Sequence, residues 1–385
     1  MNKNDLIRGG TLFKPLLVLV LSMVLLLSGA VLPAREAQAA PAAPKPTREV
    51  DLSQGNVTVK DKEVVRVYQN SGTTTVNNIT VPNGVNATVI LENVNRVLNG
   101  SGYAFFNIME NANVKILLKG KNKSTTSGTI AGLNVAIRKG SSLTIEDYGN
   151  GDGELDIAHL TNGGNSYPIL GAIDGGTGSL TINSGKVIAT SRYWGTAIGA
   201  GDNSTLNLTV NDPAVVEAHS LGQGAAIGTI SGQTVNATVN ATINGGTVRA
   251  DNCSEWMIGS NMRAGAVIGT GVAEKGTQNV TLNIPKASTA KLYLDTFYGG
   301  AAIGGSGSAN VAANGLLSGS SKQSVTANIE GGTLDIVVRG QGAGIGSGAG
   351  VTYNQTIEAN IGGGNITIRT QKPATRPVLP LAWGC

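Results

Sequence analysis

The sequence predicts an all-β fold, a single-stranded parallel β-helix (β-solenoid) with three short strands per rung and about ten rungs. The first observation is a recurring strand–turn–strand unit, seen as ITVPNGVNATVIL (79–91) and FNIMENANVKILL (106–118). The second is a recurring phrase, AIG or a near variant, whose isoleucines are Ile198, Ile227, Ile268, Ile303 and Ile345. The third is 55 glycines in 385 residues with few aromatics, which would fill one globular core poorly.

The strands that precede each AIG phrase align in columns. One column reads Val187, Val216, Val248, Leu292, Leu334 and Ile366, and the next but one reads Ala189, Ala218, Ala250, Leu294, Ile336 and Ile368. Alternate residues of a strand face opposite sides, so these two columns are predicted to point inward. Stacking then buries stripes that no single rung could bury alone.

Glycine pairs mark the connections between strands. NGGT (244–247), EGGT (330–333) and GGGN (362–365) join the first strand of a rung to the second, where a tight turn requires positive φ. Right-handed coiling is expected from the handedness of parallel crossovers.

The N-terminus has the pattern of an export signal. In residues 1–39, Lys3, Arg8 and Lys14 flank an apolar run that ends at Ala37-Gln38-Ala39. This predicts a signal peptide, cleaved before Ala40, and the alternative is an uncleaved membrane anchor. We therefore expect a secreted, extracellular or cell-wall-associated protein with no membrane span after cleavage.

Charge argues against nucleic acid as a partner. Removing the four basic and two acidic residues of the signal from the 28 and 24 of the whole chain leaves a net charge of +2. The remaining lysines and arginines are dispersed and form no basic patch.

The mature chain divides into four predicted segments. Residues 40–56 are a Pro/Ala-rich linker, 57–170 are N-terminal solenoid rungs, and 171–370 are rungs with the AIG phrase. The tail 371–385 breaks the repeat and is expected to be irregular and truncated. An uncapped last rung would favour self-association.

The phrases GSSLTIEDYGNGDGELDI, NSGKVIAT, INGGTVRA and GAAIGG resemble Gly-rich β-helix repeat surface proteins of Gram-positive bacteria, of the carbohydrate-binding or adhesin-like type. The resemblance covers about residues 76–370. It implies a β-helix at the cell surface and does not specify an activity.

The outward columns hold a first candidate site. His219, Asp251 and Asp295 are expected on three successive rungs, about 4.8 Å apart. Two such carboxylates with a histidine are the residue types for acid–base chemistry on a polysaccharide or for binding calcium. The alternative is a solvated face whose charges Arg249 and Arg369 balance.

Aromatic residues form a second candidate site. They follow the second strand of several rungs, so the solenoid is expected to collect them along one edge, and they are Tyr193, Trp194, Trp256, Phe297 and Tyr298. Aromatic faces in a row can stack on sugar rings. The alternative is that these rings pack under the loops.

A third candidate is a calcium loop between SLTI and ELDI. Oxygen ligands recur at alternate positions around glycine turns, at Asp147, Asn150, Asp152, Glu154 and Asp156. The final bidentate glutamate of an EF-hand is missing, and a plain turn is the alternative. Calcium is the one cofactor considered.

Three functions follow. The first is a non-enzymatic surface protein for adhesion or polysaccharide binding, with a polysaccharide or a host or cell-wall glycan as partner. The second is a polysaccharide-degrading lyase or glycoside hydrolase on a β-helix. The third is a structural stalk without a ligand.

Overall fold

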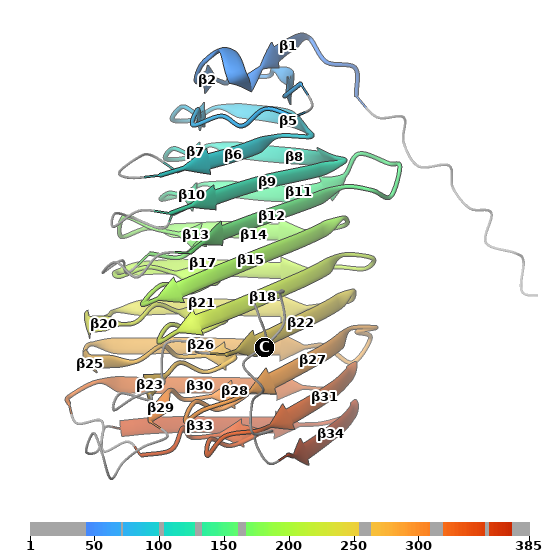
Figure 1. Ribbon diagram of the computed structural model, residues 1–385. Coiled ribbons are helices and arrows are strands. Elements are labelled where there is room, and N and C mark those ends of the chain that lie inside the picture. The colour runs from blue at the N-terminus through green and yellow to red at the C-terminus, as the bar shows by residue number, and fades with distance from the viewer. Residues whose placement is uncertain are drawn as a thin grey trace, which may run out of the picture. The chain divides into compact units, whose positions relative to one another are not determined.

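The computed structural model describes residues 44–371 except 71, 100–103, 128–132, 161–166, 254–262, 309–318 and 351–353. The predicted signal peptide, Trp256 and most of the predicted tail lie outside these residues. Within them the chain is all-β, with one short 3-10 turn, η1 (Leu52–Gln54). Figure 1 shows the strands stacked along one axis from the N-terminal to the C-terminal rungs.

Three parallel sheets run along the solenoid. Sheet A has eleven strands: β1 (Arg48–Asp51), β3 (Val64–Tyr68), β5 (Asn86–Glu92), β8 (Asn113–Lys119), β11 (Ser142–Asp147), β14 (Thr177–Ile182), β17 (Ser204–Val210), β21 (Ala237–Ile243), β26 (Thr277–Ile284), β30 (Lys322–Ile329) and β33 (Asn354–Ile361).

Sheet B has ten short strands: β2 (Val57–Thr58), β4 (Ile79–Val81), β7 (Phe106–Ile108), β10 (Val135–Ile137), β13 (Leu170–Ala172), β16 (Ile198–Ala200), β19 (Ile227–Thr229), β24 (Ile268–Gly269), β28 (Ile303–Gly304) and β32 (Ile345–Gly346).

Sheet C has nine strands: β6 (Asn95–Leu98), β9 (Lys121–Thr126), β12 (Glu154–His159), β15 (Lys186–Tyr193), β18 (Val215–Gly222), β22 (Thr247–Asn252), β27 (Lys291–Thr296), β31 (Thr333–Val338) and β34 (Asn365–Thr370). Each complete rung runs from sheet B through sheet A to sheet C. Two small pairs lie outside them, parallel β20 (Gly232–Thr234) with β25 (Ala273–Lys275) and antiparallel β23 (Arg263–Ala264) with β29 (Gly307–Ser308).

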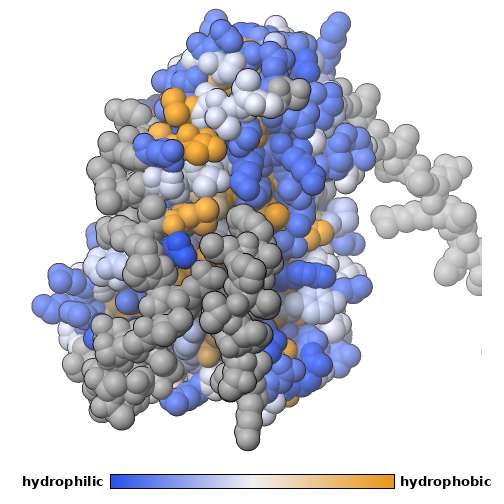
Figure 2. Space-filling model, in the orientation of Figure 1, coloured by the Kyte–Doolittle hydropathy of each residue, from blue (hydrophilic) through white to orange (hydrophobic). Residues whose placement is uncertain are grey.

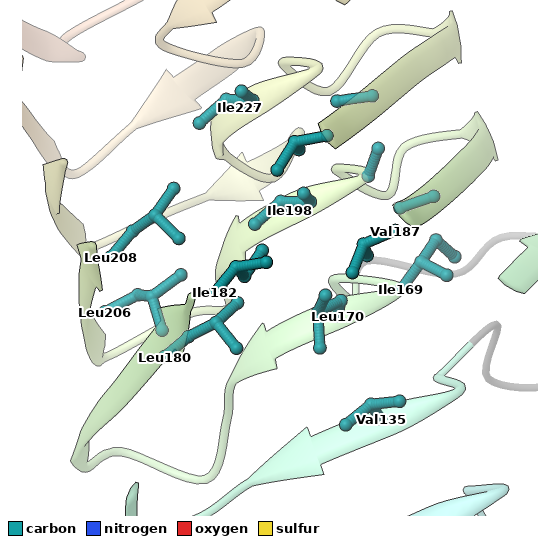
Figure 3. Close-up of a cluster of buried hydrophobic side chains, with 14 of the residues drawn as sticks. Val135, Ile169, Leu170, Leu180, Ile182, Val187, Ile198, Leu206, Leu208 and Ile227 are labelled. Carbon is teal, nitrogen blue, oxygen red and sulfur yellow. The ribbon is translucent and has the colours of Figure 1, made fainter. Parts of the chain in front are cut away.

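The parallel β-helix with three strands per rung is therefore confirmed. The predicted inward columns of sheet C pair in register from strand to strand, as Val187 with Val216 and Ala189 with Ala218. The isoleucines of the AIG phrase also stack, beginning with Ile198 on Ile227. Figure 3 shows side chains from all three sheets meeting in one core, Leu206 and Leu208 among them.

The glycine of the AIG phrase is required by how closely neighbouring rungs approach at sheet B. A Cβ on Gly199 would lie 1.7 Å from the carbonyl oxygen of Gly228, and one on Gly228 would lie 1.8 Å from that of Gly269. Gly228 also has a φ of 149°. Any side chain at Gly199 or Gly228 would collide with backbone, so these positions of the AIG phrase admit glycine alone.

Buried polar residues lie near the C-terminal ends of sheet C strands, where the chain turns toward sheet B. Ser220 donates a hydrogen bond to the carbonyl of Gly224 at 2.7 Å, and Thr296 donates one to that of Gly300 at 2.8 Å. Both side chains are buried. These bonds satisfy backbone groups at the corner that no strand partner reaches.

The structure corrects the predicted linker. Strand β1 pairs with β3, with Arg48 opposite Val65, so regular structure begins before residue 57. Arg48 also binds Glu63, with 2.6 Å between Nε and Oε1. The pairing with β3 and this ion pair keep residues 48–51 in a strand at the edge of sheet A. The Pro/Ala composition had suggested an extended, solvated segment. The segments 57–170 and 171–370 share the same three sheets.

The last described rung is less covered than the others. Ile361 of β33 and Ile368 of β34 are 56% and 49% exposed, whereas Ile329 and Ile336 one rung earlier are buried. Self-association through this rung stays a prediction.

Candidate functional site

The outer face of sheet C carries most of the residues that the sequence singled out. In the view of Figure 1 its strands lie in front of those of sheet A. Hydrophilic residues predominate where this side of the molecule is not covered by grey atoms in Figure 2. We call the outward side chains of β15 to β34, with the residues that directly follow these strands, the sheet C face.

The aromatic residues lie along one edge of this face. Ser191 and Thr296 belong to the same inward column, and Tyr193 and Tyr298 each follow two residues later. They are three rungs apart, or about 14 Å. Tyr193 stacks on Trp194 with ring centroids 4.8 Å apart. The rings are half-buried, so each leaves part of its surface open.

Two further rings on this face lie next to guanidinium groups. Arg249 lies 4.8 Å from the ring centre of Tyr293, which is 42% exposed, and Arg339 lies 5.1 Å from that of Phe297. Tyr293 was not among the predicted binding residues, although it lies between Leu292 and Leu294 of the two predicted inward columns and must therefore point outward. The predicted column could have indicated it, because an outward tyrosine on a central strand has no core to fill.

The acidic column is confirmed as a column. His219 pairs with Asp251 in register, and Asp251 pairs with Asp295. His219 Nδ1 lies 2.6 Å from Asp251 Oδ2. Arg339 Nε donates to both oxygens of Asp295 at 2.9 Å, and its Nη2 lies 2.8 Å from Oδ2.

The charge balance differs from the expected one. Arg369 binds Asp335 at 2.6 Å and Arg249 lies over Tyr293, so neither arginine is the partner of Asp295. Arg339 has that role. Sequence alignment missed it because Arg339 follows the end of β31 and lies outside the repeating strand.

The contact between His219 and Asp251 depends on whether the imidazole is protonated. Burial lowers the pKa of His219, but the hydrogen bond and charge of Asp251, and the charges of Glu217 and Asp156, outweigh burial and raise it. The charged imidazole then donates from Nδ1 to Asp251 as part of an ion pair.

This arrangement differs from a pair of carboxylates that share a proton. Asp251 binds a histidine and Asp295 binds an arginine, so each of the two acids has its own cationic partner. Glycosidic cleavage needs one acid to stay protonated beside the scissile bond. Asp251 and Asp295 therefore form two separate ion pairs on this face.

The predicted calcium ligands are spread over several contacts. Asp147 accepts hydrogen bonds from the backbone amides of Gly149, Gly151 and Gly153 at 2.7–2.9 Å. Asp152 accepts one from the amide of Gly120 at 3.0 Å.

The other two carboxylates face lysines. Glu154 lies 3.9 Å from Lys186, and Asp156 lies 3.3 Å from Lys123. Within the described residues no three His, Cys, Asp or Glu side chains are grouped to hold a metal ion. The geometry favours a turn closed by Asp147, with Asn150 inside it.

Comparisons with known proteins give no match: the chain matches no family model, no curated protein and no solved structure. In the part of the chain that the structure describes, the search for a helix with the length and apolarity of a membrane span found none.

Proposed function

We propose that the protein is a non-enzymatic, secreted or cell-surface protein that binds polysaccharide chains on its sheet C face. The observation that carries the proposal is the set of part-exposed rings on this face, Tyr193, Trp194, Tyr293, Phe297 and Tyr298, spread over rungs stacked in register. The rings form two groups three rungs, or about 14 Å, apart, and a ligand that is itself a chain of rings could stack on both.

The groups between the rings are suited to an uncharged or weakly charged glycan. Asp251, Asp295 and Asp335 are each paired with a cation on the same face. Paired charges present donors and acceptors to hydroxyl groups without a strong field of one sign. The polysaccharide would therefore be held by stacking and hydrogen bonds, with little dependence on salt.

The predicted export signal agrees with this proposal, because polysaccharides of cell walls and matrices lie outside the cytoplasm. The resemblance to Gly-rich surface proteins points the same way. A polysaccharide-degrading enzyme and a stalk without a ligand are the alternatives that the first experiment must separate.

The experiment is binding of the purified protein to soluble and insoluble polysaccharides, with calcium and with chelator, while released sugar ends are assayed. Retention without release, unaffected by chelator, is expected. Tyr293→Ala should lower affinity about tenfold, since one stacking ring is lost.

Tyr68→Ala is the matched control. Arg66 lies 4.8 Å from the ring centre of Tyr68, the same contact as Arg249 with Tyr293, but on sheet A. Its retention should equal that of the wild type. Equal losses in both variants would contradict the assignment to sheet C, sugar release would favour the enzyme, and no retention would favour the stalk.

A further inference from the structure

The outer face of sheet A carries a regular array of uncharged side chains from β14 to β30. Its three columns are Thr177, Thr205, Thr238, Asn279 and Ser324; Ser179, Asn207, Asn240, Thr281 and Thr326; and Thr181, Thr209, Thr242, Asn283 and Asn328. We call these fifteen residues the threonine–asparagine array. All are half-buried or exposed, and none is charged or aromatic.

The array is periodic in two directions. Each strand from β14 to β30 pairs residue by residue with the next across all three columns, with no bulge. The columns therefore repeat about every 4.8 Å between rungs and about every 6.6 Å along a strand. The residues between them point inward, as Leu206 and Leu208 do in Figure 3.

The side chains of the array are held in place. Asn240 donates a hydrogen bond to Asn207 at 3.0 Å, and Asn328 donates one to Asn283 at 2.8 Å. Threonine is branched at Cβ and has few rotamers in a strand. Little side-chain entropy remains to be lost when a rigid partner docks on the array.

The residue types of the array limit the class of ligand that it can bind. Without charge it offers no attraction to ionic ligands, and without rings it offers no stacking for sugars. What it presents is hydroxyls, amides and threonine methyl groups at fixed spacing. Hydroxyls and amides anchor water by hydrogen bonds, and the methyl groups restrict the orientation of the water between them.

Hydroxyls, amides and methyl groups at regular spacing suit a partner that is itself ordered water. In ice the molecules are immobile before contact, so merging the two layers costs little further entropy. We propose that the threonine–asparagine array binds ice. This function is separate from glycan binding, which is proposed for the aromatic and charged residues of sheet C.

Charged residues appear in the columns on both sides of the array. On the C-terminal side Glu358 of β33 directly follows Thr326. On the N-terminal side Ser142 and Thr144 of β11 continue two columns, and Lys115 of β8 comes next; both Lys115 and Glu358 are exposed. A charge on the contact surface would hold its own hydration shell against the ice lattice. The fifteen neutral positions are the continuous patch on which docking is expected, and the exposed Lys322 at the start of β30 lies just outside them.

The test is inhibition of ice recrystallisation and thermal hysteresis by the purified protein. The wild type is expected to keep ice grains small at micromolar concentration. Asn240→Glu, at the centre of the array, should weaken this effect about tenfold or more, because a fully hydrated carboxylate cannot merge with the lattice. Asn240→Gln, longer but neutral, should give a smaller loss and covers the case in which the glutamate variant does not fold.

Thr247→Glu is the matched control. Thr247 lies on β22 in the same rung, on the sheet C side and opposite Lys291, where a glutamate is compatible with the fold. It should retain full activity on ice. A wild type no better than an inert protein of equal size, or equal losses in N240E and T247E, would overturn the proposal. Loss of glycan retention in N240E without any ice activity would also overturn it in favour of a crystalline polysaccharide.

Discussion

The outer faces of sheets A and C differ although the same rungs build both. From β14 to β30, sheet A presents only threonine, serine and asparagine in the three columns of the array. Over the same rungs sheet C presents ion pairs and aromatic rings, as in Asp295 with Arg339 and Arg249 with Tyr293. Inward columns are alike in both sheets, since each must fill the same core. The outward residues do not fill the core, so their types can differ with what each face contacts.

Sheet A itself shows that neutrality is not imposed by the fold. In its N-terminal strands Arg66 binds Glu49 and Glu92 at 2.7 Å and 2.6 Å, and Lys115 binds Glu146 at 3.1 Å. The same sheet therefore tolerates charge where the array is absent. The array is a local property of its five strands.

The largest expected effect comes from the close backbone contact between rungs at sheet B, because the outer faces of sheets A and C both depend on the stacking of the rungs. Gly199→Ala places a Cβ 1.7 Å from the oxygen of Gly228, so the free energy of unfolding should fall by at least about 4 kcal/mol. Denaturant unfolding measures this, and both faces should lose binding together. Gly201→Ala is the control, because its Cβ would lie 3.4 Å from Ala172, an ordinary contact, and should cost little. Equal stability of the two variants would contradict the stacking of sheet B.

A smaller effect, on the pH dependence of folding stability, is expected from a histidine on the inward side of sheet C. His159 is buried, with Nδ1 3.0 Å from the hydroxyl of Thr126, and burial and then the charge of Arg192 lower its pKa to about 4. The unfolded chain protonates this residue near pH 6.5, so folding stability should fall as the pH drops from there toward 4. About 2 kcal/mol should be lost by about pH 5.

Unfolding free energies at pH 7 and pH 5 measure this change. In His159→Gln the difference between the two pH values should shrink by the same amount, whatever the absolute stability of the variant. An unchanged difference would show that His159 titrates normally in the folded protein.

The smallest effect separates the two faces by pH. The pKa of His219 is raised, so its contribution to stability is complete below 6.5 and is lost as the pH rises through the folded pKa. Raising the pH should weaken the His219–Asp251 ion pair and alter glycan binding on sheet C. The threonine–asparagine array has no titratable group, so ice activity should stay constant over the same range.

NMR titration of the imidazole reports the pKa of His219 directly. In Asp251→Asn it should fall, because the acceptor charge that outweighs burial has been removed. A raised pKa that survives this substitution would assign the shift to other acidic neighbours.

Sequence reasoning succeeded where a residue repeats. The stacks of Ile198 on Ile227 and of Val187 on Val216 follow from alternation and period alone. The position of His219, Asp251 and Asp295 in one column followed from the same alignment. Repetition predicts register, and register predicts which outward residues are neighbours.

It failed where contacts come from outside the repeat. Arg339 binds Asp295 from beyond its strand, and β1 pairs through four residues within a composition typical of a linker. Asp147 turned inward onto three glycine amides, a conformation set by local backbone that ligand spacing does not encode. Such contacts depend on local backbone conformation and on residues outside the repeat, which the period of the sequence does not encode.

The glycine column of sheet B has an evolutionary consequence. Since Ile198-Gly199 and Ile227-Gly228 occupy equivalent places, a whole rung between them can in principle be duplicated or deleted with each junction meeting the same neighbours. Such an event would lengthen or shorten the molecule by about 4.8 Å and add or remove one row on every face. The reach of this protein, and the size of whatever it contacts, can thus be adjusted by recombination in steps of one rung.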